Sequence, residues 1–341
     1  MAGLRVAVAG ATGLVGRTIL QALEHNPLIP VSNLVALASE RTAGTHIDFQ
    51  GEQVEVRRLK EDSFRGCDLA FFSAGAAVSR RFAPIAAPHA RWVIDNSSAF
   101  RMEPAIPLVV PEVNAQALRS YRGIIANPNC STIQMVVALA PLHLRYGLES
   151  VVVSTYQSVS GSGAKGIRAL DQEIVTGVQS PDSPYPHPIA LNVLPHIDTF
   201  DSDGWSGEEH KMIVETRKIM SLPDLHVVPT TARVPVRIGH SESIYARFSE
   251  RVDVADAREL LKSADGIIVR DEPGEDVYPL AREAAGSDGV FVGRIRQIPG
   301  DDHALALWVV ADNVRKGAAT NATRIAELAL ANSKEVKPAH V

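Results

Sequence analysis

Short apolar runs, each followed by glycine or a polar residue, alternate with helical patterns over roughly the first 130 residues. The runs are Leu4–Ala9, Val31–Ala38, 68–73 and 91–95. An apolar run without polar alternation is typical of a strand that is buried on both faces, as in a parallel sheet. Because helical patterns separate these runs, the sequence predicts an α/β domain with a doubly wound, Rossmann-like parallel sheet.

The pattern changes after about residue 148, where β-branched residues and polar alternation become frequent. The predicted strands of this part are residues 151–157, 226–229, 233–236, 243–248 and 304–310, and the predicted helices are residues 167–175, 208–220 and 254–262. This order predicts an α+β domain with a mostly antiparallel sheet. Residues 177–188, rich in Pro, Ser and Asp, are expected to form a surface loop.

A last helical pattern, residues 318–331, is expected to return to the first domain. We therefore predict one domain from residues 1–127 together with a C-terminal helix of about residues 315–341. The second domain is predicted to span residues 128–314.

Composition supports a globular protein and narrows its partners. The chain has 341 residues, of which 45% are hydrophobic and 21% charged, and its net charge is −5. The absence of a basic excess argues against nucleic acid and anionic membranes as partners. Residues 1–8 are typical of a first strand rather than a signal peptide. We also find no apolar run of about 18 residues that would span a membrane.

The two cysteines, Cys67 and Cys130, form neither a disulfide framework nor a zinc-binding spacing. We therefore expect a reducing, cytoplasmic setting and no metal site. Cys67 directly precedes a buried run, so we interpret it as structural.

A glycine-rich turn lies between the first predicted strand and a helical pattern. Gly10, Gly13 and Gly16 follow one another at a spacing of three. Gly10 would allow a tight turn, Gly13 would let the backbone approach a pyrophosphate, and Gly16 would let the helix pack closely. The pattern predicts a dinucleotide site, and a merely structural turn is the alternative.

The choice between NAD and NADP depends on the end of the second predicted strand. An acidic residue there would hold the ribose 2′-hydroxyl of NAD, whereas an arginine would accommodate the 2′-phosphate of NADP. Both are present, as Glu40 and Arg41. Ser39, Arg41 and Thr42 together favour NADP.

Cys130 follows an apolar run and directly precedes a second helical pattern, with Asn127, Pro128 and Asn129 between them. This order predicts a strand, a turn and a helix that begins at the thiol. Backbone N–H groups and the helix dipole favour negative charge there, so we expect the thiol to ionise readily and to act as a nucleophile. A small buried apolar side chain is the alternative.

Several polar side chains of the second part are candidates for a site. Gln157 ends a predicted strand before the small residues 158–164, which would permit close approach to a ligand or form a flexible turn. Glu208 and Lys211 are three residues apart and share a helix face, where they could also form a simple exposed ion pair.

A second group of candidates is cationic or titrates near neutral pH. Arg233, Arg237 and His240 follow a predicted strand, and His240 could move a proton or be an ordinary loop residue. Arg101 follows another strand end and could reach the crevice where doubly wound sheets bind ligands.

Taken together, these motifs closely resemble the aspartate-β-semialdehyde dehydrogenase family over essentially the whole chain and in the same order. The matching segments are residues 10–16, 97–101, 127–132, 156–163, 208–211, 233–240 and 312–319. The cysteine segment and the spacing of seven between Arg233 and His240 are the most specific of them.

The resemblance implies a role for each residue. Cys130 would be the nucleophile, His240 the acid–base catalyst, and Gln157 would orient the substrate carbonyl. Arg233 would bind the substrate α-carboxylate, although the residues alone leave Arg237 open as an alternative. The implied substrate-binding residues are Arg101, Glu208, Lys211, Arg233 and Asn129, with Glu208 at the amino group and Arg101 and Lys211 at phosphate. The implied NADP-binding residues are Gly10, Ala11, Thr12, Gly13, Leu14, Val15, Gly16, Ser39, Arg41, Thr42, Ser73, Ser160, Gly161 and Asn313.

The activity that the resemblance implies is the NADPH-dependent reductive dephosphorylation of L-aspartyl-4-phosphate. Its products are L-aspartate-4-semialdehyde and inorganic phosphate, formed reversibly through a thioester on Cys130. The reaction belongs to the biosynthesis of lysine, methionine, threonine and diaminopimelate. The family also implies a homodimer, or a dimer of dimers. Glu40 beside Arg41 is a departure from what an NADP site needs.

Two other classes remain as alternatives. N-acetyl-γ-glutamyl-phosphate reductases carry out the same reaction type on an acylated substrate, which needs no anionic partner for an amino group. Glu208, and Asn129 directly before Cys130, favour the aspartyl substrate. A non-catalytic dinucleotide-binding homologue would be expected to lack Cys130 or His240, and both are present.

Overall fold

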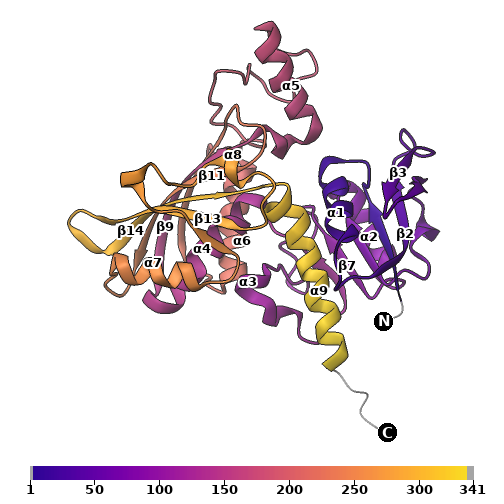
Figure 1. Ribbon diagram of the computed structural model, residues 1–341, viewed down its shortest axis with the longest axis horizontal. Helices are drawn as coiled ribbons and strands as arrows, with labels where there is room; N and C mark the ends of the chain where they lie inside the picture. Colours follow the sequence, from indigo (N-terminus) through magenta and orange to yellow (C-terminus); the bar gives the residue numbers. More distant parts are fainter. Residues whose placement is uncertain (1–2, 336–341) are drawn as a thin grey trace. The chain divides into compact units, whose positions relative to one another are not determined.

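A computed structural model of the chain describes residues 3–335, which form two compact units. The first unit comprises residues 3–128 and 318–335, and the second comprises residues 129–317. Each unit contains one six-stranded sheet (Figure 1).

The first unit is built on a parallel sheet in the order β5-β2-β1-β6-β7-β8. Its strands are β1 (Leu4–Ala9), β2 (Val31–Ala38), β5 (Arg57–Arg58), β6 (Leu69–Phe72), β7 (Trp92–Asp95) and β8 (Gly123–Ala126), and β3 (His46–Phe49) and β4 (Glu52–Glu55) form a separate hairpin. The helices are α1 (Leu14–Glu24), α2 (Ala76–Ala86), α3 (Pro111–Asn114) and α9 (Thr320–Glu335), with 3₁₀ turns η1 (Glu61–Phe64) and η2 (Ala115–Leu118). The predicted doubly wound sheet is confirmed, and its order reverses between β1 and β6, where such sheets bind ligands.

Strand β1 shows why the first apolar run lacks polar alternation. Val6 and Val8 pack in one core with residues of α1 and α9, whereas Ala7 and Ala9 pack in another core with residues of α2. All four side chains are buried because helices cover both faces of the sheet. Helix α9, drawn in yellow in Figure 1, contacts α1 and β7.

The second unit contains a mixed sheet in the order β10-β9-β11-β14-β13-β12, in which the pairings at the two edges are parallel and the others antiparallel. Its strands are β9 (Leu148–Gln157), β10 (His226–Arg233), β11 (His240–Phe248), β12 (Ile267–Val269), β13 (Val290–Ile298) and β14 (Asp301–Ala311). The helices are α4 (Cys130–Tyr146), α5 (Gly163–Thr176), α6 (Gly207–Met220), α7 (Val254–Ser263) and α8 (Ala281–Ala284), with 3₁₀ turns η3 (Val159–Ser162) and η4 (Pro273–Glu275).

The alternation of β11 decides which of its residues can serve a buried site. His240, Glu242 and Ile244 are buried and share one face, whereas Ser243 and Tyr245 are only partly buried on the other. Helix α4 packs against β9, β11 and β14. The start of β11 therefore brings polar side chains into the interior of the unit.

Two predicted elements differ from the structure. A separate strand at residues 233–236 is wrong, because β10 runs from His226 to Arg233 and then ends. Pro235 has no N–H to continue a ladder, and Gly239 turns the chain at a φ of 98°. The predicted helix 318–331 is preceded by a π turn, η5 (Arg315–Ala319), and α9 continues to Glu335. Residues 336–341 of the predicted C-terminal helix lie outside the described residues.

Residues 177–188 contain no helix or strand, in agreement with the predicted loop. The segment is nevertheless anchored, because Tyr185 packs in a small core with Val159, Leu170, Ile189 and Leu194. Within the described residues, no helix is long and apolar enough to cross a membrane.

Candidate active site

Cys130 is the first residue of α4, as predicted, and its side chain is half-buried. Asn129 caps this helix, since its Oδ1 accepts the backbone N–H groups of Ser131 (3.0 Å) and Thr132 (3.2 Å). Behind the thiol, a Cβ at Gly317 would lie 2.7 Å from the Cβ of Cys130. The capping residue and this glycine therefore fix where the sulfur lies.

Glu208 joins residues that are far apart in sequence. Its Oε1 accepts from Asn129 Nδ2 (2.8 Å) and from Gln157 Nε2 (2.9 Å), and its Oε2 accepts from Lys211 Nζ (3.3 Å). The side chain is buried, so the alternative of an exposed ion pair does not hold for it. Burial acts to raise the pKa of Glu208, but Lys211, the two amides and Arg233 outweigh it and hold that pKa below its usual value.

Helix α6 holds Asn129, the residue before Cys130, at a second point. Glu215 is buried seven residues after Glu208, so both lie on one face of the helix. Its Oε2 accepts the backbone N–H of Asn129 (2.6 Å). Sequence reasoning missed Glu215, although its spacing from Glu208 is a signal that could have identified it.

Lys211 lies between two carboxylates. Its Nζ donates to Asp198 Oδ2 (2.6 Å) as well as to Glu208. Burial acts to lower the pKa of Lys211, but Glu208 and Asp198 outweigh it and raise that pKa, so the group is a cation at neutral pH. Asp198 is a neighbour that the sequence analysis did not single out.

His240 begins β11, and its ring is fully buried. The backbone N–H of Ser158 donates to Nδ1 (3.0 Å), so a neutral ring carries its proton on Nε2. Nε2 has no hydrogen-bond partner among the described residues. Burial, and to a lesser degree the charge of Arg233, place the pKa of His240 well below its usual value. The ring is therefore neutral at pH 7 and presents an N–H donor.

The two candidate arginines lie in different surroundings. Arg233 is buried and donates from Nη1 to the backbone oxygen of Ser158 (2.8 Å), and its Nε has no partner among the described residues. A Cβ at Gly161 would lie 2.6 Å from Arg233 Nη1 and 3.5 Å from His240 Cε1. Arg237, in contrast, is exposed and pairs with Asp171 (2.9 Å). Of the two, Arg233 lies beside His240.

Asn313 organises the loop that leads to His240. Its Oδ1 accepts from Ser158 Oγ (2.9 Å), Ser160 Oγ (3.0 Å) and the backbone N–H of Gly239 (3.0 Å). This oxygen is fully used within the second unit. The predicted contact of Ser160, Gly161 and Asn313 with a cofactor stays a prediction.

The glycine loop, residues 10–16, has the geometry that its spacing predicts. Gly10 has a φ of 86°, and a Cβ there would lie 2.3 Å from the backbone oxygen of Ser73. A Cβ at Gly16 would lie 2.1 Å from the backbone oxygen of Gly10, while Gly13 caps α1. Only glycine fits at residues 10 and 16, which leaves backbone facing the N-terminus of α1, where a pyrophosphate would fit.

A cavity of about 500 Å³ adjoins this loop and is lined in part by Gly10, Thr12, Gly13, Ser39 and Ser73. Glu40 and Arg58 also line it and form a salt bridge of 3.0 Å. Arg41 is exposed, and Thr42 contacts Thr12 through their hydroxyl groups (3.3 Å). Arg58 was missed from the sequence because β5, which contains it, is too short to be recognised.

Arg101 is buried within the first unit. Its Nε donates to the backbone oxygen of Asn127 (2.9 Å) and its Nη2 to that of Asn96 (3.0 Å). The side-chain amide of Asn96 has no hydrogen-bond partner among the described residues. Asn96 is thus a further polar group that the sequence analysis did not select.

Comparisons with known proteins agree with this geometry. Residues 5–121 match the family model of the semialdehyde dehydrogenase NAD binding domain, and residues 139–316 match that of the semialdehyde dehydrogenase dimerisation domain. The chain is 52% identical to the aspartate-semialdehyde dehydrogenase of Aquifex aeolicus over 96% of its own length and 98% of that relative.

Solved structures of family members are also similar, and two of them are informative here. The aspartate semialdehyde dehydrogenase II of Vibrio cholerae, complexed with ASA, is 42% identical, superposes with a TM-score of 0.91, and covers 99% of this chain and 100% of its own. The Candida albicans aspartate semialdehyde dehydrogenase with NADP is 26% identical, with a TM-score of 0.78 and coverages of 97% and 99%. The sequence-based resemblance is thereby confirmed, and the chain belongs to the aspartate-semialdehyde dehydrogenase family.

Proposed function

We propose that this chain reduces L-aspartyl-4-phosphate to L-aspartate-4-semialdehyde and phosphate with NADPH, reversibly. The observation that carries the proposal is the buried polar cluster of Asn129, Gln157, Glu208, Arg233 and His240, which adjoins the helix that begins at Cys130. The Vibrio relative was solved in complex with ASA, in agreement with this substrate. We place the reaction in the aspartate branch of amino-acid biosynthesis, in the cytoplasm.

The charges of the cluster fit an amino acid. Glu208 is a buried carboxylate and suits an ammonium group, whereas Arg233 is a buried guanidinium and suits the α-carboxylate through two parallel hydrogen bonds. Lys211 and Arg101 are proposed as ligands of the phosphoryl group or of inorganic phosphate. Lys211 would then exchange Asp198 for phosphate oxygens.

In the reductive direction, the thiolate of Cys130 attacks the acyl carbon, and phosphate leaves to give a thioester. Gln157 donates to the carbonyl oxygen and orients it. Bound NADPH supplies the hydride that reduces the thioester. His240 donates a hydrogen bond from Nε2–H to the oxygen that becomes negative, and so stabilises this oxyanion until the aldehyde forms and the thiolate leaves.

The tautomer of His240 fits this role. Because Nδ1 accepts from the backbone of Ser158, the neutral ring has its proton on Nε2 and needs no prior protonation to donate this hydrogen bond. Its lowered pKa keeps the ring in this neutral form at pH 7. The same Nε2–H would stabilise the oxyanion in the oxidative direction, because the reverse reaction passes through the same intermediate.

We propose NADP as the cofactor of the first unit, as in the Candida relative. The glycine loop and its adjoining cavity fit the pyrophosphate and adenosine half. Ser39, Arg41 and Thr42 would hold the 2′-phosphate. The salt bridge from Arg58 neutralises Glu40, which offsets the repulsion that this carboxylate would otherwise exert on a phosphate.

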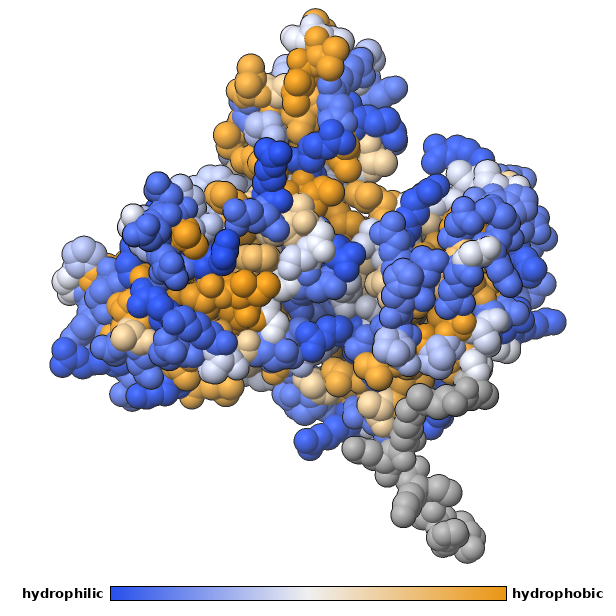
Figure 2. All heavy atoms as spheres, viewed as in Figure 1, coloured by the Kyte–Doolittle hydropathy of each residue, from blue (hydrophilic) through white to orange (hydrophobic). Residues whose placement is uncertain are grey.

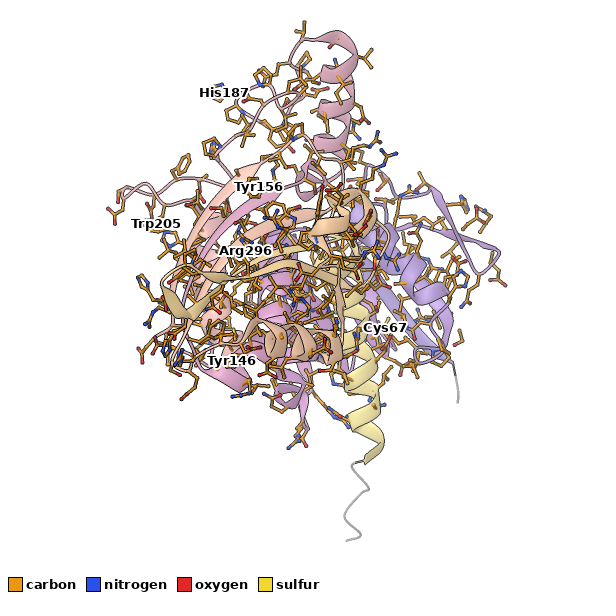
Figure 3. The ribbon with its side chains drawn as sticks, turned by 60° about the vertical axis from the view of Figure 1, so that its left-hand side comes forward. Cys67, Tyr146, Tyr156, His187, Trp205 and Arg296 are labelled. Carbon is orange, nitrogen blue, oxygen red and sulfur yellow. The ribbon has the colours of Figure 1, made fainter. Side chains whose placement is uncertain are left out.

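We also propose that the second unit forms a homodimer, with a dimer of dimers as the alternative. One face of its sheet exposes Val152 (46%) and Tyr156 (38%), and Tyr156 packs on Trp308. Figure 3 labels Tyr156 and Arg296, which come from β9 and β13 of this sheet. Figure 2 shows a further apolar patch over α5, on which Ile174 and Val175 are exposed. Such a face favours burial against a second copy, and sedimentation of the protein tests it.

The experiment that tests the activity is reduction of NADP in the presence of phosphate, with L-aspartate-4-semialdehyde as substrate. We expect turnover that depends on phosphate. N-acetylglutamate-γ-semialdehyde is the control, because an acetylated amine cannot pair with Glu208. Turnover of the acetylated substrate alone, or of neither, would contradict the proposal.

A further inference from the structure

Glu242 is a fully buried carboxyl group for which the proposed mechanism has no use. It lies on β11, two residues from His240 and on the same face of the strand. Neither of its oxygens has a hydrogen-bond partner among the described residues. A buried carboxylate without partners is strongly disfavoured because it loses its hydration, so the protonated form is expected here.

The neighbours of Glu242 are uncharged. In the sheet it lies opposite Thr155 of β9 and Val309 of β14. From helix α4, Gln134 interacts with the carboxyl group and lowers its pKa, but burial has the larger effect and raises that pKa well above its usual value. Along the same strand face, the nearest titratable group is His240, which is itself neutral.

Gln134 connects Glu242 to the proposed catalytic groups. It is 1% exposed, and it lies four residues after Cys130, on the same face of α4. Its Nε2 donates to the backbone oxygen of His240 (3.3 Å), whereas its Oε1 has no partner among the described residues. A buried amide oxygen needs a hydrogen-bond donor, and a protonated carboxyl group next to it supplies one.

We propose that Glu242 is a protonated positioning acid, which pairs with the Gln134 amide and thereby fixes Gln134 between the nucleophile helix and His240. In this pair the carboxyl O–H donates to Gln134 Oε1 and one amide N–H donates to the carboxyl C=O, which leaves the second amide N–H for the backbone oxygen of His240. The pair holds the start of β11 against the N-terminal part of α4. It thereby fixes the separation between the His240 imidazole and the Cys130 sulfur. This inference rests on the proposed roles of Cys130 and His240.

Neutrality is as important as position. A negative charge at Glu242 would favour the protonated form of His240 and raise the pKa of the imidazole. The imidazolium would then replace the Nε2–H tautomer that the backbone of Ser158 selects. A protonated acid supplies the hydrogen bond without that charge, which a buried carboxylate cannot do.

Kinetics of four variants and one control variant test the proposal. Glu242→Gln keeps a neutral donor and should retain kcat within about twofold, whereas Glu242→Leu and Gln134→Leu should each lower kcat at least about tenfold. KM for NADP should be unchanged in all three variants. The double variant should lose no more than either single one, because both remove the same pair. Thr216→Val is the matched control, because it also removes a buried polar group of the second unit that has no hydrogen-bond partner among the described residues, and it should leave kcat unchanged.

Equal losses in Glu242→Gln and Glu242→Leu would overturn the proposal, since a charge would then be required. Additive losses in the double variant, or wild-type kcat in both leucine variants, would also overturn it. If the wild-type protein turns over neither semialdehyde, the proposed function fails instead, and the protonation of Glu242 is tested without activity as follows.

Protonation is read from the infrared difference spectrum and from stability. Wild type minus Glu242→Gln should show the carbonyl band of a protonated carboxylic acid at neutral pH. A group whose pKa is raised in the folded state loses its stabilising effect as pH rises. The wild-type Tm should therefore fall relative to that of Glu242→Gln between about pH 5 and about pH 8. Absence of the band, or parallel Tm profiles, would contradict a protonated Glu242, also where the leucine variants fail to fold.

Discussion

The glycine loop of the first unit and the buried polar cluster of the second, which we propose as the cofactor and substrate sites, are built in opposite ways. The loop is a run of seven consecutive residues, 10–16, that would contact a ligand through its backbone. Glycine stands at residues 10 and 16, where a Cβ would lie too close to a backbone carbonyl oxygen. The cluster instead collects side chains from positions 129, 157, 208, 233 and 240, on five different elements or their ends. The geometry of the loop depends on the absence of side chains at Gly10 and Gly16, whereas the geometry of the cluster depends on hydrogen bonds between its side chains.

The two sites should therefore fail differently. In the loop, one added methyl group should affect the local turn and cofactor binding but not the substrate cluster. In the cluster, a change at one residue should affect partners that are distant in sequence, because Glu208 alone engages two of them, Asn129 and Gln157.

The largest effect is expected for Cys130→Ser, which keeps the shape of the cluster but removes the proposed nucleophile. Turnover should fall by at least about 10³-fold, since a serine hydroxyl is a far weaker nucleophile than a thiolate. Binding of NADP, measured by calorimetry, should be unchanged because the glycine loop is untouched. Substantial turnover would remove Cys130 from its proposed role.

The next effect sharpens the contrast from the side of the loop. In Gly16→Ala, the new Cβ would lie 2.1 Å from the backbone oxygen of Gly10, so the turn must open. Affinity for NADP should fall by about 100-fold or more, and unfolding should become easier by about 1–3 kcal/mol. Gly274→Ala is the control, because nothing lies within 4 Å of its added Cβ. Wild-type affinity in Gly16→Ala would show that the loop does not hold the cofactor.

Glu208→Gln should have a smaller effect, confined to the substrate. The variant keeps an acceptor for Asn129 or Gln157 but loses the charge, so kcat/KM for the semialdehyde should fall by about 100-fold, or about 3 kcal/mol. Glu259→Gln is a matched control: Glu259 and Lys262 are also three residues apart, but both are exposed. That pair should contribute almost nothing. Equal effects in the two variants would place Glu208 outside the substrate site.

The smallest effect is expected for Arg41→Ala, at the edge of the cavity. KM for NADP should rise by about tenfold and that for NAD should change little, because only NADP has a 2′-phosphate. Arg58→Ala is the informative companion, since it releases Glu40 from its salt bridge and should also disfavour NADP. If Arg41→Ala raises both constants equally, Arg41 does not contact the 2′-phosphate.

The sequence predicts the loop better than the cluster for a physical reason. Strands β1, β2 and β8 begin and end where the apolar runs predict, and the roles of Gly10 and Gly16 follow from local backbone sterics. In the second unit, the start of α4 at Cys130 is also local, because Asn129 and Pro128 specify it. Residues whose function depends on a neighbour distant in sequence are harder to predict.

Glu215, Asp198 and Glu242 illustrate that limit. Each is an acidic residue without a distinguishing motif, and its significance comes from a partner 86, 13 or 108 positions away, namely Asn129, Lys211 and Gln134. The end of β10 at Arg233 was missed for the same reason. The strand pattern of the sequence continues after Arg233, and Val234 still donates to the backbone oxygen of Gln157, although β10 has ended.

The saturation of Asn129 has a consequence for how this protein can evolve or be redesigned. Its side-chain oxygen caps α4, its amide reaches Glu208, and its backbone N–H reaches Glu215. A substitution at Glu208 that favours a different amine would therefore also disturb Asn129, the residue directly before Cys130. Substrate preference and the reactivity of the thiol should therefore change together at Glu208, and Lys211 offers no independent route because it also donates to Glu208.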